Sequence, residues 1–129
     1  MTEKQAIRTD AAPAPFQGAP YSQAIRVGDL VFVSGQLALR PGEKELMGGG
    51  IGPQTEQVLA NLRAILEAAG SGLDRLVKTT VYLANLDDFG GMNEVYTRYV
   101  DDRPPARATV EVARLPSGAL VEIEAVALL

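Results

Sequence analysis

One stretch near the C-terminal end decides how this chain folds: Val121-Glu122-Ile123-Glu124-Ala125-Val126-Ala127-Leu128. Its first residues alternate between apolar and acidic side chains, which is the pattern of a β-strand with one buried face. From Ala125 to Leu128 every residue is apolar, and strands with this composition are typically buried on both faces. The stretch therefore predicts a strand inside a sheet that is covered on both sides.

Further strands are predicted upstream of this stretch. They are expected at residues 22–27, 30–35, 76–83 and 108–113, with the last strand spanning residues 120–128. Gly28-Asp29 suits a two-residue hairpin turn between the first two strands. Pro116-Ser117-Gly118 suits the turn that leads into the last one. The glycines at 48–50 and Pro41-Gly42 predict a loop over residues 40–52.

Two helices are predicted between these strands. The first opens at Pro53 and ends at Gly70, because proline suits the first turn of a helix and glycine suits its C-cap. Its apolar stripe consists of Val58, Leu62, Ile65, Leu66 and Ala69. The second helix follows a cap by Asp87 or Asp88, although Gly90-Gly91 weakens the helical pattern. Its apolar residues are Phe89, Met92, Val95, Tyr96 and Tyr99.

Together these elements predict a single α/β (α+β) domain with one sheet and two helices on one face. Pro13 and Pro15 forbid a regular helix in residues 1–19, which are expected to form an extended lead-in to a domain of residues 20–129. Two helices cannot cover both faces of a sheet of about five or six strands, so we expect another copy of the chain to cover the second face. Functional sites would then tend to lie between subunits.

Composition narrows the possible chemistry. A chain of 129 residues suits one domain, and its net charge of −4 argues against nucleic-acid binding, which usually needs a basic face. The chain has no cysteine, no signal-like start and no apolar run long enough to span a bilayer, so a soluble, cytoplasmic protein without a membrane partner is expected. It also has no histidine, which excludes serine–histidine triads, Cys/His zinc sites and histidine-dependent ribonuclease chemistry within one chain.

Arg107 is the first candidate for a functional residue. It follows Pro104-Pro105-Ala106, whose rigid prolines can aim its side chain, and its planar guanidinium is suited to binding a small carboxylate with two parallel hydrogen bonds. The alternative is an ordinary surface arginine after a turn.

Glu122 is the second candidate, because a partly buried carboxylate can hold a water molecule or move a proton. Glu124 shares its face of the strand, and the alternative is two exposed glutamates at a subunit rim.

Ser34-Gly35 is the third candidate, since a glycine at a strand end lets a ligand approach a free backbone N–H; a simple strand end is the alternative. The pairs Asp87-Asp88 and Asp101-Asp102 are better explained by capping and turns than by a metal, so no metal site is expected.

Several segments, in order along the chain, resemble the RidA/YjgF family. They include Pro20-Tyr21-Ser22-Gln23-Ala24, Val27-Gly28-Asp29 with Val33-Ser34-Gly35-Gln36, Val77-Lys78-Thr79-Thr80-Val81, Asn93-Glu94-Val95-Tyr96, Pro105-Ala106-Arg107 and Val121-Glu122-Ile123-Glu124-Ala125. The resemblance implies a chorismate-mutase-like fold with a mixed sheet, a homotrimer, and ligand clefts between neighbouring subunits. It also implies cofactor-free hydrolysis of 2-aminoacrylate, 2-iminopropanoate and 2-iminobutanoate to 2-keto acids and ammonia.

The same resemblance implies a role for each site residue. Arg107 would bind the substrate carboxylate with help from the Gly35 N–H, and Glu122 would position the attacking water with help from the Thr109 carbonyl. Tyr21, Ser34 and Asn93 would line the pocket. The chain departs from many relatives at Thr109, where they carry cysteine, so reactive-thiol behaviour cannot apply.

Three alternative functions stay open at this stage. The chain could deaminate a larger substrate such as 2-aminomuconate, or bind ligands as a chaperone-like trimer without turnover. An endoribonuclease or translation inhibitor is the third, against which the acidic balance and the absence of histidine argue.

Overall fold

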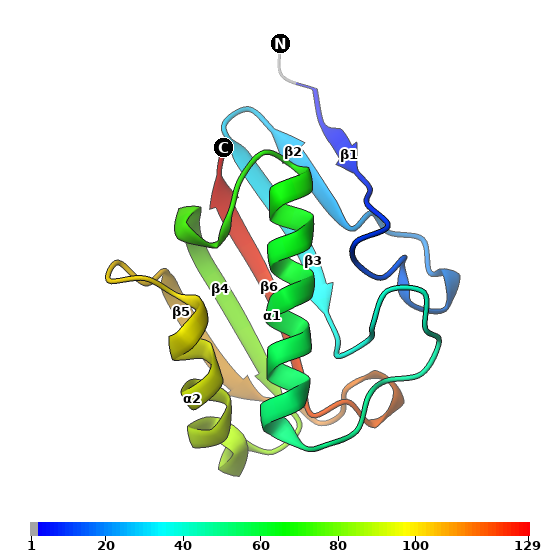
Figure 1. The fold of residues 1–129 in the computed structure, drawn as a ribbon, viewed down its shortest axis with the longest axis vertical. Helices are drawn as coiled ribbons and strands as arrows, with labels where there is room; N and C mark the ends of the chain where they lie inside the picture. The colour runs from blue at the N-terminus through cyan, green and yellow to red at the C-terminus, as the bar shows by residue number, and fades with distance from the viewer. Residues whose placement is uncertain (1–2) are drawn as a thin grey trace.

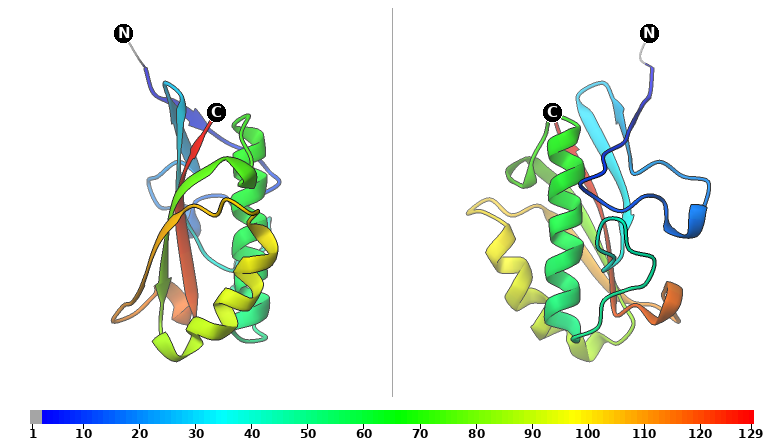
Figure 2. Two further views of the ribbon diagram at one scale, coloured as in Figure 1. Left: turned by 90° about the vertical axis from the view of Figure 1, so that its left-hand side faces the viewer. Right: turned by 45° about the vertical axis from the view of Figure 1, so that its right-hand side comes forward.

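The computed structural model, which describes residues 3–129, is built on one six-stranded mixed sheet in the order β1-β2-β3-β6-β4-β5. Both helices lie on the same face of this sheet, as the edge-on view in Figure 2 shows. The elements are β1 (Gln5–Ile7), β2 (Ala24–Val27), β3 (Leu30–Gln36), α1 (Ile51–Ala68), β4 (Leu76–Leu83), α2 (Phe89–Tyr99), β5 (Ala106–Glu111) and β6 (Val121–Leu128). The predicted single domain with one mixed sheet and two helices on one face is confirmed.

β6 lies in the middle of the sheet, where it pairs antiparallel with both β3 and β4 (Figure 1). Only β4 and β5 pair in parallel, with Thr79 opposite Arg107. Alternate residues of β6 are buried under the helices, and these are Val121, Ile123, Ala125 and Ala127. The alternation that predicted the strand therefore separates a helix-covered face from a second face that carries Glu122 and Glu124.

The helix ends follow the expected residues closely. α1 begins at Ile51, two residues before Pro53, so the proline occupies the first turn. Gly70 takes φ +88° just beyond the last turn, a conformation that glycine adopts without strain. Asp88 occupies the N-cap position of α2, as predicted, but its side chain makes no capping hydrogen bond. Asn85 caps the short 3-10 turn Leu86–Asp88 that precedes α2, and its side chain accepts from the Asp87 N–H at 2.9 Å.

The glycines that weaken the second helix have a packing reason. A Cβ added at Gly91 would lie 2.7 Å from Cγ2 of Ile51, so α2 can approach α1 this closely only because residue 91 has no side chain. α1 in turn packs on β3 and β6, and α2 lies beside α1 above β4 and β5 (Figure 1). The core is thus a single layer of side chains between the sheet and the two helices.

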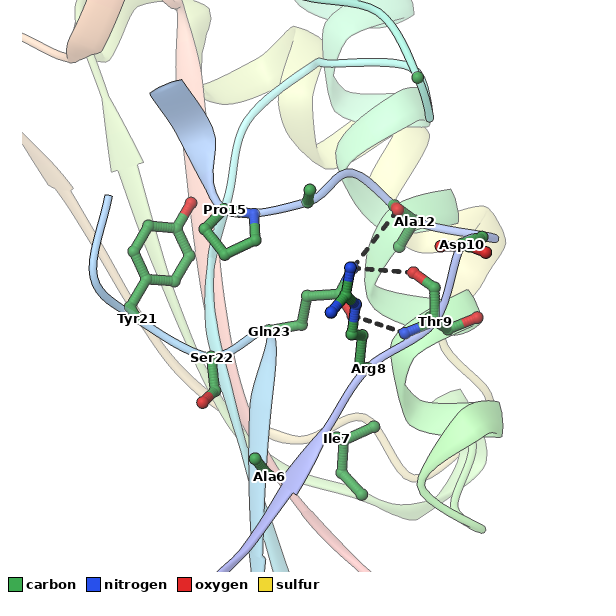
Figure 3. A pocket seen from close by; sticks show the side chains of 12 residues that line it. Ala6, Ile7, Arg8, Thr9, Asp10, Ala12, Pro15, Tyr21, Ser22 and Gln23 are labelled. Atoms are coloured by element: carbon green, nitrogen blue, oxygen red, sulfur yellow. Dashed lines mark hydrogen bonds between the residues drawn. The ribbon is translucent and has the colours of Figure 1, made fainter. Parts of the chain in front are cut away.

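The N-terminal segment is extended, but it also contributes the edge strand β1, which pairs antiparallel with β2. Met1 and Thr2 of the predicted lead-in lie outside the described residues. Beyond β1 the buried Gln23 side chain holds the chain: its amide nitrogen donates to the carbonyls of Thr9 (3.0 Å) and Pro13 (2.7 Å), and its oxygen accepts from the Thr9 N–H at 2.7 Å. Figure 3 shows this amide among the residues that line the adjacent groove.

The second face of the sheet is not covered by any element formed from residues 3–129 (Figure 2). It carries large apolar side chains that are more than 40% exposed, namely Phe32, Val110 and Leu128. Val126 of β6, opposite Phe32, is only partly buried there. The expectation that another copy covers this face stays a prediction. No helix within the described part of the chain has the length and apolar character needed to cross a membrane.

Candidate active site

Glu122 lies on the open face of β6, directly against Gly35 of β3. A Cβ added at Gly35 would overlap the Glu122 carboxylate and lie 2.8 Å from its Cδ, so only glycine leaves room for this side chain. The carboxylate has no hydrogen-bond partner within residues 3–129. It is therefore available to a water molecule or a ligand.

Gly35 lies in an irregular part of the ladder between β3 and β6. The register changes between Val33, opposite Ala125, and Gln36, opposite Ile123, which places Ser34 and Gly35 in a β-bulge. A bulge leaves one residue out of the ladder and redirects its backbone groups. The Ser34 hydroxyl donates to the Ser22 carbonyl at 2.6 Å, so this side chain holds β3 to the segment before β2.

Tyr21 lies beside Glu122 and Gly35, and together they line a cavity on this side of the molecule. Its side chain is 40% exposed, and its hydroxyl accepts a hydrogen bond from the Phe16 N–H at 2.6 Å, which leaves the hydroxyl proton free to be donated. The cavity has a volume of about 670 Å³, and Tyr21, Ser34, Gly35 and Glu122 line it. We call these four residues the Glu122 cluster.

The electrostatics of this cluster favour proton transfer. Burial, and to a lesser extent the negative charge of Glu124, raise the pKa of Glu122 above its ordinary value of 4.5. Glu124 accepts a hydrogen bond from the Tyr82 hydroxyl, and this bond together with burial raises the pKa of Tyr82 to about 12. Glu122 is thus a carboxyl group that can take up and release a proton closer to neutral pH than an exposed glutamate does.

Arg107 lies on the other face of the sheet, beneath α2. Its guanidinium carbon is 4.8 Å from the centroid of the Tyr96 ring and 5.5 Å from that of Phe89. No carboxylate within residues 3–129 pairs with it. The donors of Arg107 therefore remain available to an anionic ligand.

Asn93 and Thr109 accompany Arg107 on this side. Asn93 lies on α2 one turn from both Phe89 and Tyr96, and so shares their face of the helix. Thr109 is two residues beyond Arg107 on β5, and its hydroxyl is buried without a hydrogen-bond partner in the described part of the chain. We call Asn93, Arg107 and Thr109 the Arg107 cluster.

One copy of the chain does not bring the two clusters together. In the sheet, Glu122 of β6 lies opposite Tyr82 of β4, and Tyr82 lies opposite Val110 of β5. Strand β4 therefore separates β6 from β5, which are about 10 Å apart at the usual strand spacing. The two key side chains also point to opposite faces of the sheet. The predicted site residues thus form two half-sites, one on each face of the sheet.

Sequence reasoning missed two features of these half-sites. Phe89 and Tyr96 were assigned only to the apolar stripe of a helix, and Tyr82 only to a strand. The spacing of Phe89, Asn93 and Tyr96 at i, i+4 and i+7 was the available signal, because it aligns two rings and an amide on one face.

Comparisons with known proteins identify the family. The family model described as Endoribonuclease L-PSP matches residues 9–129. This chain belongs to that family, the RidA/YjgF/RutC family. A RutC family protein of Pyrococcus abyssi is 50% identical over 124 residues, which cover 96% of each chain. The 2-iminobutanoate/2-iminopropanoate deaminase of Mus musculus is 46% identical over 124 residues, covering 96% of this chain and 90% of the mouse protein.

Solved structures of RidA/YjgF/RutC proteins have the same fold. RidA of the Antarctic bacterium Psychrobacter superposes with a TM-score of 0.92 at 46% identity, covering 97% of this chain and 99% of its own. TdcF of E. coli, solved with bound serine, superposes with a TM-score of 0.90 at 37% identity, covering 97% and 98%.

Proposed function

We propose that this protein hydrolyses small reactive 2-imino acids, and the enamines in equilibrium with them, to 2-keto acids and ammonia. The observation that carries the proposal is the partly buried Glu122 carboxylate, which rests on Gly35 in an open cavity and has a raised pKa. Arg107 supplies the second requirement, a guanidinium that pairs with no carboxylate among residues 3–129. The deaminase from mouse supports the same chemistry.

The site is proposed to form between copies in a homotrimer. The Arg107 cluster of one protomer would face the Glu122 cluster of its neighbour, since one chain holds them on opposite faces. The exposed apolar residues of the open sheet face, Phe32, Val110 and Leu128, support burial against further copies.

In this mechanism Arg107 binds the substrate carboxylate with two hydrogen bonds, and the Gly35 N–H adds a third. Glu122 and the Thr109 carbonyl hold a water molecule near C2 of the protonated imine. The water oxygen attacks C2 while Glu122 accepts a proton, giving a tetrahedral amino alcohol. The proton passes from Glu122 to the nitrogen, the C–N bond breaks and ammonia leaves, while the hydroxyl oxygen forms a double bond to C2 and gives its proton to Glu122, which then releases it to ammonia or solvent. The substrate is already electrophilic, so positioning and one acid–base group suffice.

The test generates the imine in place with a threonine dehydratase and follows the appearance of ammonia and 2-ketobutanoate. The wild type is expected to accelerate the reaction and Arg107→Ala is expected not to. Arg103→Ala is the matched control, because Arg103 is an exposed arginine of the preceding loop and should retain the activity. A wild type that gives no acceleration would exclude small imines as substrates.

A larger substrate is the second candidate, because the cavity beside Glu122, of about 670 Å³ in one copy of the chain, is open to solvent. Ammonia release across a panel of imines that includes 2-aminomuconate separates these two candidates.

The name of the family model also calls for an RNA-cleavage assay. Cleavage that persists in Arg107→Ala after repeated purification would favour that activity, and tight 2-keto acid binding without ammonia release would favour a binding role.

A further inference from the structure

Among the described residues, the Arg107 guanidinium contacts two aromatic rings and forms no side-chain hydrogen bond. Its guanidinium contacts the Tyr96 ring at 4.8 Å and the Phe89 ring at 5.5 Å, both within the range of a cation–π interaction. Such contacts restrict the long side chain through the face of the guanidinium and leave the N–H groups at its rim free for a ligand. The two rings therefore orient the arginine without occupying its donors.

The Tyr96 ring is itself anchored. Its hydroxyl forms a hydrogen bond of 2.7 Å with the hydroxyl of Thr79, and both residues are buried, at 6% and 0% exposure. Buried hydroxyls need a partner, so this pair fixes the ring against rotation away from the sheet. Phe89 is 41% exposed and has no such anchor.

The anchor returns to the strand that carries Arg107. Thr79 of β4 is the direct partner of Arg107 in the parallel ladder between β4 and β5. A closed chain of contacts results: the ladder joins Arg107 to Thr79, a hydrogen bond joins Thr79 to Tyr96, and the ring contacts the guanidinium. Each of these contacts restrains the next, and together they hold α2 against the edge strand β5.

We propose that Tyr96 is a positioning residue for Arg107, with Thr79 as its anchor and Phe89 as a weaker second support. This inference rests on the proposed function, in which Arg107 binds the substrate carboxylate. Tyr96 acts through Arg107 and fixes the direction from which the carboxylate is received.

The kinetic test compares Tyr96→Leu, Tyr96→Phe and the control Tyr99→Leu. Tyr99 lies on the same helix, and its ring contacts Arg63 at 5.5 Å, so the control removes an equivalent cation–π pair elsewhere. We expect Tyr96→Leu to raise KM about tenfold, with little change in kcat, because uniform binding is lost. Tyr96→Phe retains the ring and loses the anchor, and a rise in KM of about threefold is expected. Tyr99→Leu should leave both constants unchanged.

An NMR measurement tests the positioning independently of catalysis. The Nε–Hε resonance of Arg107, assigned by its loss in Arg107→Lys, should be shifted upfield by the Tyr96 ring current in the wild type. That shift should disappear in Tyr96→Leu, shrink in Tyr96→Phe and persist in Tyr99→Leu. Because Tyr96→Phe removes only the hydroxyl oxygen, this variant still tests the positioning if Tyr96→Leu does not fold.

The outcomes separate the two proposals. If the wild type deaminates no imine but the Arg107 resonance responds as expected, the positioning stands and the proposed function fails. If the wild type is active and KM is the same in both Tyr96 variants and in Tyr99→Leu, Tyr96 does not position Arg107. An Arg107 resonance that does not respond to Tyr96→Phe would overturn the inference as well.

Discussion

The Glu122 cluster and the Arg107 cluster are held in place by different physical means. Glu122 rests against the backbone at Gly35 and has no hydrogen-bond partner within residues 3–129, so burial and the charge of Glu124 set its properties. The orientation of the Arg107 guanidinium is set by two rings, one of them anchored to Thr79. The surroundings of Glu122 thus change its pKa, whereas the surroundings of Arg107 fix the orientation of its side chain. Variants should therefore affect the two in different ways.

Glu122→Gln should have the largest effect. The amide retains the shape of the side chain but cannot exchange a proton, and kcat is expected to fall by about 10²- to 10⁴-fold. Steady-state deaminase kinetics measure this, with Glu94→Gln on the exposed face of α2 as control. A Glu122→Gln variant with wild-type kcat would remove the carboxylate from the mechanism.

Gly35→Ala should come next, because the added methyl group must displace the Glu122 carboxylate. We expect kcat to fall about tenfold or more and the free energy of unfolding to fall by about 1–3 kcal/mol, as in overpacked sites. Gly52→Ala, whose Cβ would meet nothing within 4 Å, is the matched control. Urea unfolding and kinetics of both variants give the comparison, and equal behaviour of the two would contradict the close contact.

Glu124→Gln should change the pH dependence and leave the maximal rate nearly intact. Removing the neighbouring charge lowers the pKa of Glu122, so the acid limb of the kcat profile should move to lower pH. The pH dependence of the free energy of unfolding has the opposite sign to that produced by a salt-bridged carboxylate. Because the folded-state pKa is raised, the folded protein binds more protons than the unfolded chain at pH values above 4.5, and wild-type stability falls as pH rises from there to the raised pKa. Chemical denaturation at several pH values should show this fall reduced in Glu124→Gln. An unchanged acid limb would mean that burial alone sets the pKa of Glu122.

The smallest effect is expected for Gly91→Ala, on the helix side. The methyl group would meet Cγ2 of Ile51 at 2.7 Å, and α2 must move slightly away from α1. The gain in helix propensity of about 1 kcal/mol offsets part of the strain, so thermal stability should change little. The displacement carries Phe89 and Tyr96 with it, so KM should rise about twofold to threefold while the acid limb stays in place. A shifted acid limb would show that the two half-sites are not independent.

Local patterns in the sequence predicted most of the fold. The Gly28-Asp29 turn, the end of α1 at Gly70 and the whole of β4 follow from turn chemistry, capping and alternation, each within a few residues. β1 was missed, because three residues with a single buried side chain carry too little pattern to separate a strand from an extended lead-in.

The site was harder to predict for a geometric reason. Alternation shows that Arg107 and Thr109 share one face of their strand, but not which face of the sheet that is. The answer depends on the parallel register with β4, which places Arg107 opposite the buried Thr79 and therefore beneath α2. Register between strands distant in sequence is a tertiary property, and no local pattern encodes it.

The contact between Gly35 and Glu122 also constrains how this chain can evolve. A side chain at position 35 displaces the Glu122 carboxylate from its present place, whereas a residue shorter than glutamate at position 122 would leave room for it. The two positions, 87 residues apart in sequence, are therefore coupled, because a change at position 35 alters the place of the carboxylate at position 122. In a library randomised at both positions, selection for activity should enrich glycine at position 35 most strongly in the clones that carry glutamate at position 122.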